Sequence, residues 1–117
     1  MELNELTALS PIDGRYRGKT HQLAPFLSEL GLMKYRVQVE VEYFIALGNE
    51  SGVGVTSASD AEKEALRDIY RNFSETDAGE IKDFERVTNH DVKAVEYFLK
   101  EKMKAMGLEE SLEFVHF

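Results

Sequence analysis

Three positively charged side chains lie within five residues near the start of the chain, in the run Arg15-Tyr16-Arg17-Gly18-Lys19. A guanidinium group presents a planar fork of donors that matches the oxygens of a phosphate or a carboxylate. Glycine lets the backbone approach a ligand closely. The run therefore suits an anionic ligand, although short clusters of charge are also common on protein surfaces. The residues alone favour a solvated basic loop for that reason.

A second group of candidate residues is Thr88-Asn89-His90-Asp91, which directly precedes the clearest helical pattern in the chain. Free backbone N–H groups and the dipole at a helix start favour anions. Histidine can donate a proton or a hydrogen bond near neutral pH. The alternative is simple capping, with His90 as an incidental turn residue. The residues alone favour this alternative, because every helix start needs a cap.

Other kinds of site are not indicated by the sequence. The chain has no cysteine, and its three histidines, His21, His90 and His116, show no metal-ligand spacing. The glycine-rich loops that bind mononucleotides and dinucleotides are also missing from the sequence. The sequence therefore predicts neither a metal site nor a glycine-rich nucleotide-binding loop.

Composition limits the class of partner. Hydrophobic residues make up 43% of the 117 residues, which is ordinary for a folded globular domain. The net charge of −8 argues against general nucleic-acid binding, because neutralising phosphates needs a basic surface. No apolar run approaches the roughly 20 residues that span a bilayer, and the first residues do not resemble a secretory signal. We expect no nucleic acid and no membrane as partners.

The elements that must position the two candidate groups can be read from turn and helix signals. Turn residues fill the first 19 positions, which predicts an irregular arm, and a short helix follows over residues 20–30, with Gly31 as a break. Three glycines and three serines predict a loop over residues 48–59.

Three further helices are predicted after that loop. Ser59 with Glu62, and Ser74 with Asp77, have the spacing of N-terminal caps. The last helix has one apolar stripe and ends at Gly107. The stripe consists of Val92, Val95, Leu99, Met103 and Met106.

Residues 32–47 give conflicting signals. Their apolar side chains mostly alternate in period two, which favours a strand, whereas about sixteen residues without a turn signal favour a helix. The pattern alone leans slightly towards a strand. The alternating residues are Tyr35, Val37, Val39, Val41, Tyr43 and Ile45.

Four stretches of the sequence resemble, in order, the bacterial-type adenylosuccinate lyases of the fumarase/aspartase superfamily. The stretches are Leu6 to Tyr16, Leu32 to Glu42, Thr88 to Leu99 and Glu113 to Phe117. Four motifs in register are more specific than any one of them. They favour a functional interpretation of both candidate groups over a plain loop and a plain cap.

The resemblance implies an all-α fold, in which residues 1–117 form a single helical N-terminal domain with an irregular arm. Residues 32–47 should then be helical and buried on several sides. The implied enzyme eliminates fumarate from adenylosuccinate, giving AMP, and from succinylaminoimidazole carboxamide ribotide, in purine biosynthesis. It would be a cytoplasmic homotetramer with a small-molecule substrate and without a cofactor.

By the same resemblance, Arg15 and Tyr16 bind the phosphate end of the substrate. Asn89, His90 and Asp91 line the pocket, with His90 in direct contact and Asp91 capping the helix. The general acid, the general base, the central helical bundle and the C-terminal domain of the family lie beyond Phe117, so we expect the chain alone to be inactive.

Two other hypotheses remain for the chain. One is a helical module that binds a nucleotide or a partner without chemistry. The other is a sister lyase that acts on argininosuccinate or another succinyl adduct. The first and third stretches argue against the sister lyase.

Overall fold

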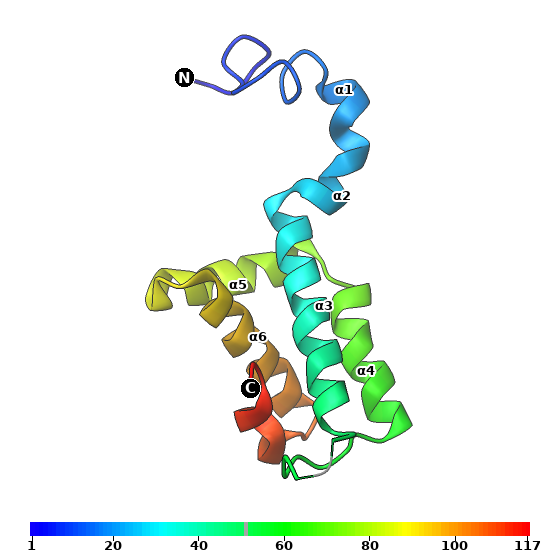
Figure 1. The fold of residues 1–117 in the computed structure, drawn as a ribbon. Helices are drawn as coiled ribbons and strands as arrows, with labels where there is room; N and C mark the ends of the chain where they lie inside the picture. The colour runs from blue at the N-terminus through cyan, green and yellow to red at the C-terminus, as the bar shows by residue number, and fades with distance from the viewer. Residues whose placement is uncertain (51) are drawn as a thin grey trace. The chain divides into compact units, whose positions relative to one another are not determined.

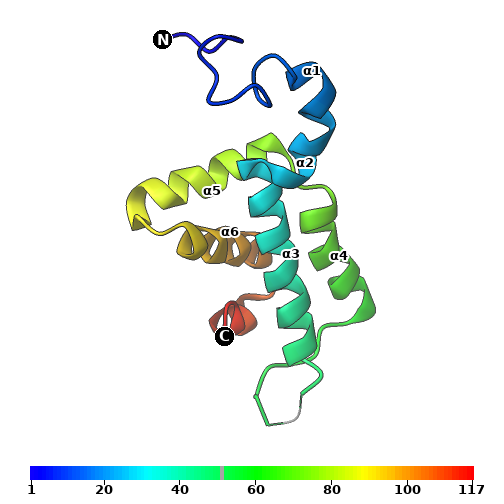
Figure 2. The same ribbon diagram turned by 45° about the horizontal axis from the view of Figure 1, so that its top comes forward.

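Helices are the regular elements of the computed structural model, which describes residues 1–50 and 52–117 (Figures 1 and 2). No strand occurs in this described part, so the all-α prediction is confirmed. No helix in it has both the length and the apolar character needed to cross a membrane. The chain divides into two compact units, residues 1–32 and 33–117, and each is described by itself. The expectation of one domain over residues 1–117 stays a prediction.

The first unit begins with the irregular arm that the turn residues predict. Asp13 organises it, because its Oδ1 accepts hydrogen bonds from the Ser10 backbone N–H at 2.8 Å and the Ser10 hydroxyl at 3.2 Å. These bonds, the one from the Ser10 backbone first, hold the pKa of Asp13 below its ordinary value. Thr20 closes the arm by donating from its hydroxyl to the Ile12 carbonyl at 2.9 Å.

Short helical turns follow the arm in place of one short helix. They are α1 (Arg17–Thr20), the 3₁₀ turn η1 (His21–Leu23) and α2 (Ala24–Leu27). Pro25 lies in the first turn of α2, where the missing N–H is not needed. Ser28 then has an extended conformation, with ψ of 171°, and ends the segment.

Helix α3 (Glu29–Leu47) begins directly after Ser28, whose hydroxyl oxygen caps it by accepting the Gly31 N–H at 3.2 Å. The predicted break at Gly31 is therefore wrong, since this residue lies in the first turn of α3. A Cβ at Gly31 would stand 2.8 Å from backbone atoms of Phe26. Glycine is needed here for close backbone approach and not for a turn.

The helical form of α3 corrects the leaning towards a strand that the alternating pattern produced. Successive buried side chains along α3 in the second unit are spaced by about one helical turn. They are Met33, Val37, Val41, Phe44, Ile45 and Leu47. The other alternating residues form an exposed stripe: Tyr35, Val39 and Tyr43 are 41%, 66% and 46% exposed. The expected burial of this helix on several sides is thus not met in the chain.

Helices α4 (Asp60–Arg71) and α5 (Glu75–Thr88) start where their caps predict. Ser59 and Glu62, and likewise Ser74 and Asp77, exchange both hydrogen bonds of a capping box. The predicted loop before α4 is present in its described residues, and Ser51 lies outside them.

Helix α6 (Asp91–Ala105) runs back along α5, and both lie beside α3 in the two views (Figures 1 and 2). Its predicted stripe supplies buried Val95, Leu99 and Met103 to the core. Phe98 is completely buried, and its ring meets Phe73 edge-on at 6.0 Å between centroids. Most of the buried core of the second unit comes from α3 and α6, and α4 and α5 add Leu66 and Ile81.

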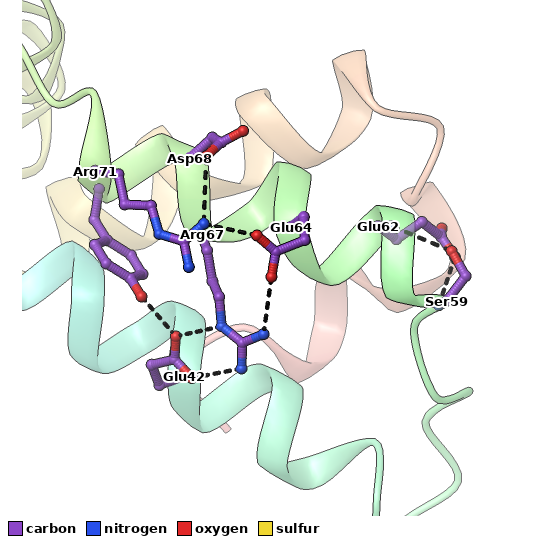
Figure 3. A network of polar contacts seen from close by, with 8 residues as sticks. Glu42, Ser59, Glu62, Glu64, Arg67, Asp68 and Arg71 are labelled. Atoms are coloured by element: carbon purple, nitrogen blue, oxygen red, sulfur yellow. Dashed lines mark hydrogen bonds and ion pairs between the residues drawn. The ribbon is translucent and has the colours of Figure 1, made fainter.

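A carboxylate joins α3 to α4. Glu42 of α3 accepts from Arg67 Nε at 2.9 Å, Arg67 Nη2 at 3.2 Å and the Tyr70 hydroxyl at 2.8 Å (Figure 3). The Arg67 guanidinium is the main reason why the pKa of Glu42 lies below its ordinary value. Glu64 extends the network by pairing with Arg71 at 2.7 Å.

The end of α6 has the left-handed glycine that the sequence predicts. Gly107 has φ of 78°, and the next residue, Leu108, donates from its N–H to the Met103 carbonyl at 2.9 Å. A 3₁₀ turn, η2 (Glu109–Phe114), then leads to the tail. In the tail, the Nδ1 of His116 pairs with Glu40 of α3.

Candidate functional site

Arg15 and Tyr16 form an exposed pair immediately before α1. Arg15 Nη2 donates to the Tyr16 hydroxyl at 3.0 Å, and its Cζ lies 4.7 Å from the centre of the ring. The ammonium of Lys19 is 5.8 Å from the same ring. A guanidinium carries five N–H donors, so one bond to Tyr16 leaves others to face a ligand. The first unit thus presents a fixed, positively charged pair on its surface.

The second group occupies the connection between α5 and α6, where only Asn89 and His90 separate the two helices. Asn89 is left-handed, with φ of 53°, a conformation that asparagine tolerates better than most residues. Thr88 stabilises the turn, because its hydroxyl oxygen accepts the His90 N–H at 3.3 Å. Both exposed side chains therefore project from a short turn anchored by a helix on each side.

His90 is itself the N-cap of α6. Its Nδ1 accepts the Lys93 backbone N–H at 3.0 Å. In a neutral ring the hydrogen then belongs to Nε2, which becomes a donor directed away from the helix backbone. This corrects the expectation that Asp91 caps the helix: Asp91 is the first residue of α6.

Asp91 has both carboxylate oxygens engaged. Its Oδ1 accepts the Val92 N–H at 2.9 Å, and its Oδ2 pairs with Arg36 Nη1 of α3 at 2.9 Å. The hydrogen bond from Arg36 is the first cause of a pKa of Asp91 below its ordinary value. Asp91 is therefore a stable carboxylate, poorly suited to accept a proton in a reaction near neutral pH.

The backbone at the start of α6 is less open to anions than the sequence suggested. Two of its first N–H groups, those of Val92 and Lys93, already donate to the side chains of Asp91 and His90. Recognition of a ligand at this end must therefore rely on side chains, chiefly the His90 ring and the Asn89 amide.

Charged residues on the first turns of α6 include one buried carboxylate. The Glu96 side chain is only 8% exposed, and its oxygens meet Lys93 at 2.9 Å and Lys100 at 3.0 Å. Burial opposes ionisation of Glu96, but the two ammonium groups outweigh it and keep its pKa below the ordinary value. Both ammonium groups lie over the Tyr97 ring, at 5.6 and 6.0 Å from its centre.

Sequence reasoning found part of this arrangement. The Glu96–Lys100 pair has the spacing of four residues that favours opposite charges on one helix face. The roles of Arg36 and Lys93 were missed. Arg36 lies in a stretch that resembles the lyases, but its partner is far away in the sequence, so no local spacing signals the pair.

The structure brings Arg15 to Tyr16 within the first unit, and Asn89, His90 and Asp91 together within the second. A shallow groove beside Asn89 is lined by Lys82, Glu85 and Arg86. Among residues 1–50 and 52–117, no three His, Cys, Asp or Glu side chains are arranged to hold a metal ion.

Comparison with known proteins gives one consistent family. No protein-family model matches the chain. The whole chain is 52% identical to an adenylosuccinate lyase of Dictyostelium discoideum, 51% identical to one of Vibrio cholerae and 50% identical to one of Escherichia coli. Each match covers 26% of the relative, so the chain spans about a quarter of the length of these curated relatives. Over that quarter, the chain belongs to the adenylosuccinate lyase family.

Proposed function

We propose that this chain supplies substrate-binding residues to an enzyme that eliminates fumarate from adenylosuccinate, giving AMP, and from succinylaminoimidazole carboxamide ribotide. The observation that carries the proposal is the identity of about one residue in two, over the whole chain, to adenylosuccinate lyases. The helical module without chemistry has no comparable support, because every curated relative named above is a lyase.

The substrate of such an enzyme carries a phosphate and two carboxylates, so its site needs cations and hydrogen-bond donors. Arg15 and Tyr16 offer both on the surface of the first unit. We assign them to the phosphate, because a guanidinium matches phosphate oxygens with two parallel donors.

We assign the turn between α5 and α6 to the succinyl end of the substrate. There His90 directs its Nε2 donor outward while Nδ1 caps α6, and Asn89 contributes a side-chain amide. Fumarate elimination requires a general base to remove the proton beside a carboxylate and a general acid to protonate the leaving nitrogen. His90 and Asn89 would orient the carboxylate and stabilise the charge that develops on it.

The rest of the proposal concerns the whole enzyme. We infer that the general acid and base lie outside these 117 residues, and that the longer protein is a cytoplasmic homotetramer of purine biosynthesis that needs no metal or organic cofactor. The fact that the chain spans about a quarter of its relatives supports this division of labour. We predict that the 117-residue chain by itself releases no fumarate above the uncatalysed rate.

The test is kinetic and uses a lyase of full family length that contains this chain. Arg15→Ala should mainly raise KM, by about ten- to a hundredfold, because it removes a charge-assisted pair. His90→Ala should lower kcat more than Arg15→Ala does, since it stands nearer the reacting end. Normal kinetics in both variants would show that the site residues are assigned wrongly.

A further inference from the structure

We propose that Arg36 is a positioning residue for the substrate site at the start of α6. By pairing with Asp91 it cancels a negative charge beside His90. The inference rests on the proposed function and deepens it, because it explains how a site for an anionic substrate tolerates an aspartate in its midst.

The geometry ties three residues together. Arg36 projects from α3, and its Nη1 lies 2.9 Å from Asp91 Oδ2. Asp91 directly follows His90, and its second oxygen holds the Val92 N–H at 2.9 Å. The Arg36 guanidinium thus binds the residue that directly follows the N-cap His90. It connects the α5–α6 turn to α3, a helix distant in the sequence.

The charge balance gives the pair a functional meaning. A carboxylate at the first position of a helix offsets the positive end of the helix dipole and repels an anionic ligand. An adjacent guanidinium cancels that repulsion and makes no bond to His90, whose Nδ1 accepts the Lys93 backbone N–H. With Arg36 in place, the start of α6 remains acceptable to a substrate that carries a phosphate and two carboxylates.

A purely structural role accounts less well for the pair. The side chains of Arg36 and Asp91 are 28% and 52% exposed, and ion pairs at such solvated positions contribute little to stability. The charges of these two side chains affect the binding of an anion more strongly than they affect stability, because the bound substrate excludes the water that would screen them.

The chain offers a matched control for this pair. Arg67 also bridges two helices, since it pairs with Glu42 at 2.9 Å, and its side chain is 27% exposed. It lies on α4, whereas the proposed site is at the start of α6. Arg67→Gln therefore breaks an ion pair of the same kind without uncovering a carboxylate next to His90.

The experiment compares variants of the full-length lyase containing this chain, with adenylosuccinate as the substrate. Arg36→Gln should raise KM about tenfold by leaving Asp91 uncompensated, whereas Arg67→Gln should leave KM unchanged. Arg36→Lys keeps the charge and should stay close to the parent. The double variant Arg36→Gln with Asp91→Asn removes both charges and should recover most of the lost affinity.

Each result has a definite meaning. The proposal is overturned if Arg36→Gln raises KM no more than Arg67→Gln, if it lowers only kcat, or if the double variant fails to recover. Thermal unfolding of each variant, measured in parallel, identifies an effect that merely follows instability. If Arg15→Ala and His90→Ala also leave the kinetics unchanged, the proposed function fails as well. If those two variants are impaired, only the role of Arg36 is rejected.

Discussion

Val37 and Val39 are two residues apart on α3, yet Val37 is completely buried and Val39 is 66% exposed. In a strand the two side chains would share one face, whereas a helix turns them about 200° apart. Val37→Ala should therefore lower the free energy of unfolding by about 2 kcal/mol through lost burial and a small cavity. Val39→Ala should change it by less than about 0.5 kcal/mol. Urea unfolding followed by circular dichroism measures both, and equal losses would contradict the helical assignment of α3.

Asn89 offers a way to separate backbone conformation from ligand binding. Its left-handed φ of 53° is free of penalty for glycine and costs alanine about 1 kcal/mol. Asn89→Gly should therefore unfold at nearly the same urea concentration as the parent, and Asn89→Ala at a lower one. In the full-length lyase both variants should bind substrate less well, because both lack the amide. Full affinity in Asn89→Gly would reduce this residue to a structural role.

The two roles of His90, as the N-cap of α6 and as a hydrogen-bond donor to the substrate, should likewise be separable. Asparagine is a good N-cap, so His90→Asn should keep the stability of α6, while His90→Ala should lose about 1 kcal/mol by leaving the Lys93 N–H without its acceptor. Thermal unfolding of the two variants tests the cap. Activity should fall in both, since the imidazole donor is lost in both. A fully active His90→Asn enzyme would show that only the cap matters.

Glu42 should make the second unit sensitive to acid. Its folded pKa is held below the ordinary value of 4.5, chiefly by Arg67, so its contribution to stability is complete above that value. The contribution is lost as the pH falls from 4.5 through the lower folded pKa, because protonation then favours the unfolded chain. Glu42→Gln should cost about 1 kcal/mol or less at neutral pH, given that the pair is partly exposed.

The measurement for Glu42 is urea unfolding of the parent and the variant over a range of pH. The two free energies should differ at neutral pH and converge in acid. Glu101→Gln serves as the control, because Glu101 pairs with Lys104 within the same exposed turn of α6. A difference between parent and Glu42→Gln that stays constant down to low pH would contradict the assigned role of Arg67.

Several local features of the fold were readable from the sequence. The starts of α4 and α5 followed from Ser59 with Glu62 and from Ser74 with Asp77, and the end of α6 followed from Gly107. Each of these depends on hydrogen bonds between residues at most five positions apart, so the necessary partners are visible in one short window. The resemblance to a lyase family was equally a property of the sequence alone.

Tertiary packing decided what the local patterns left open. The alternation along α3 fits two faces of a helix as well as one face of a strand, and only packing into the common core, which includes residues of α4, α5 and α6, selects which valines are buried. Arg36 with Asp91 and Arg67 with Glu42 are likewise pairs between helices, so their existence depends on how those helices pack. His90 caps α6, whereas Asp91, the predicted cap, is the first helical residue and pairs with Arg36 of α3. Interactions of this kind join distant parts of the chain, and spacing within the sequence carries no record of them.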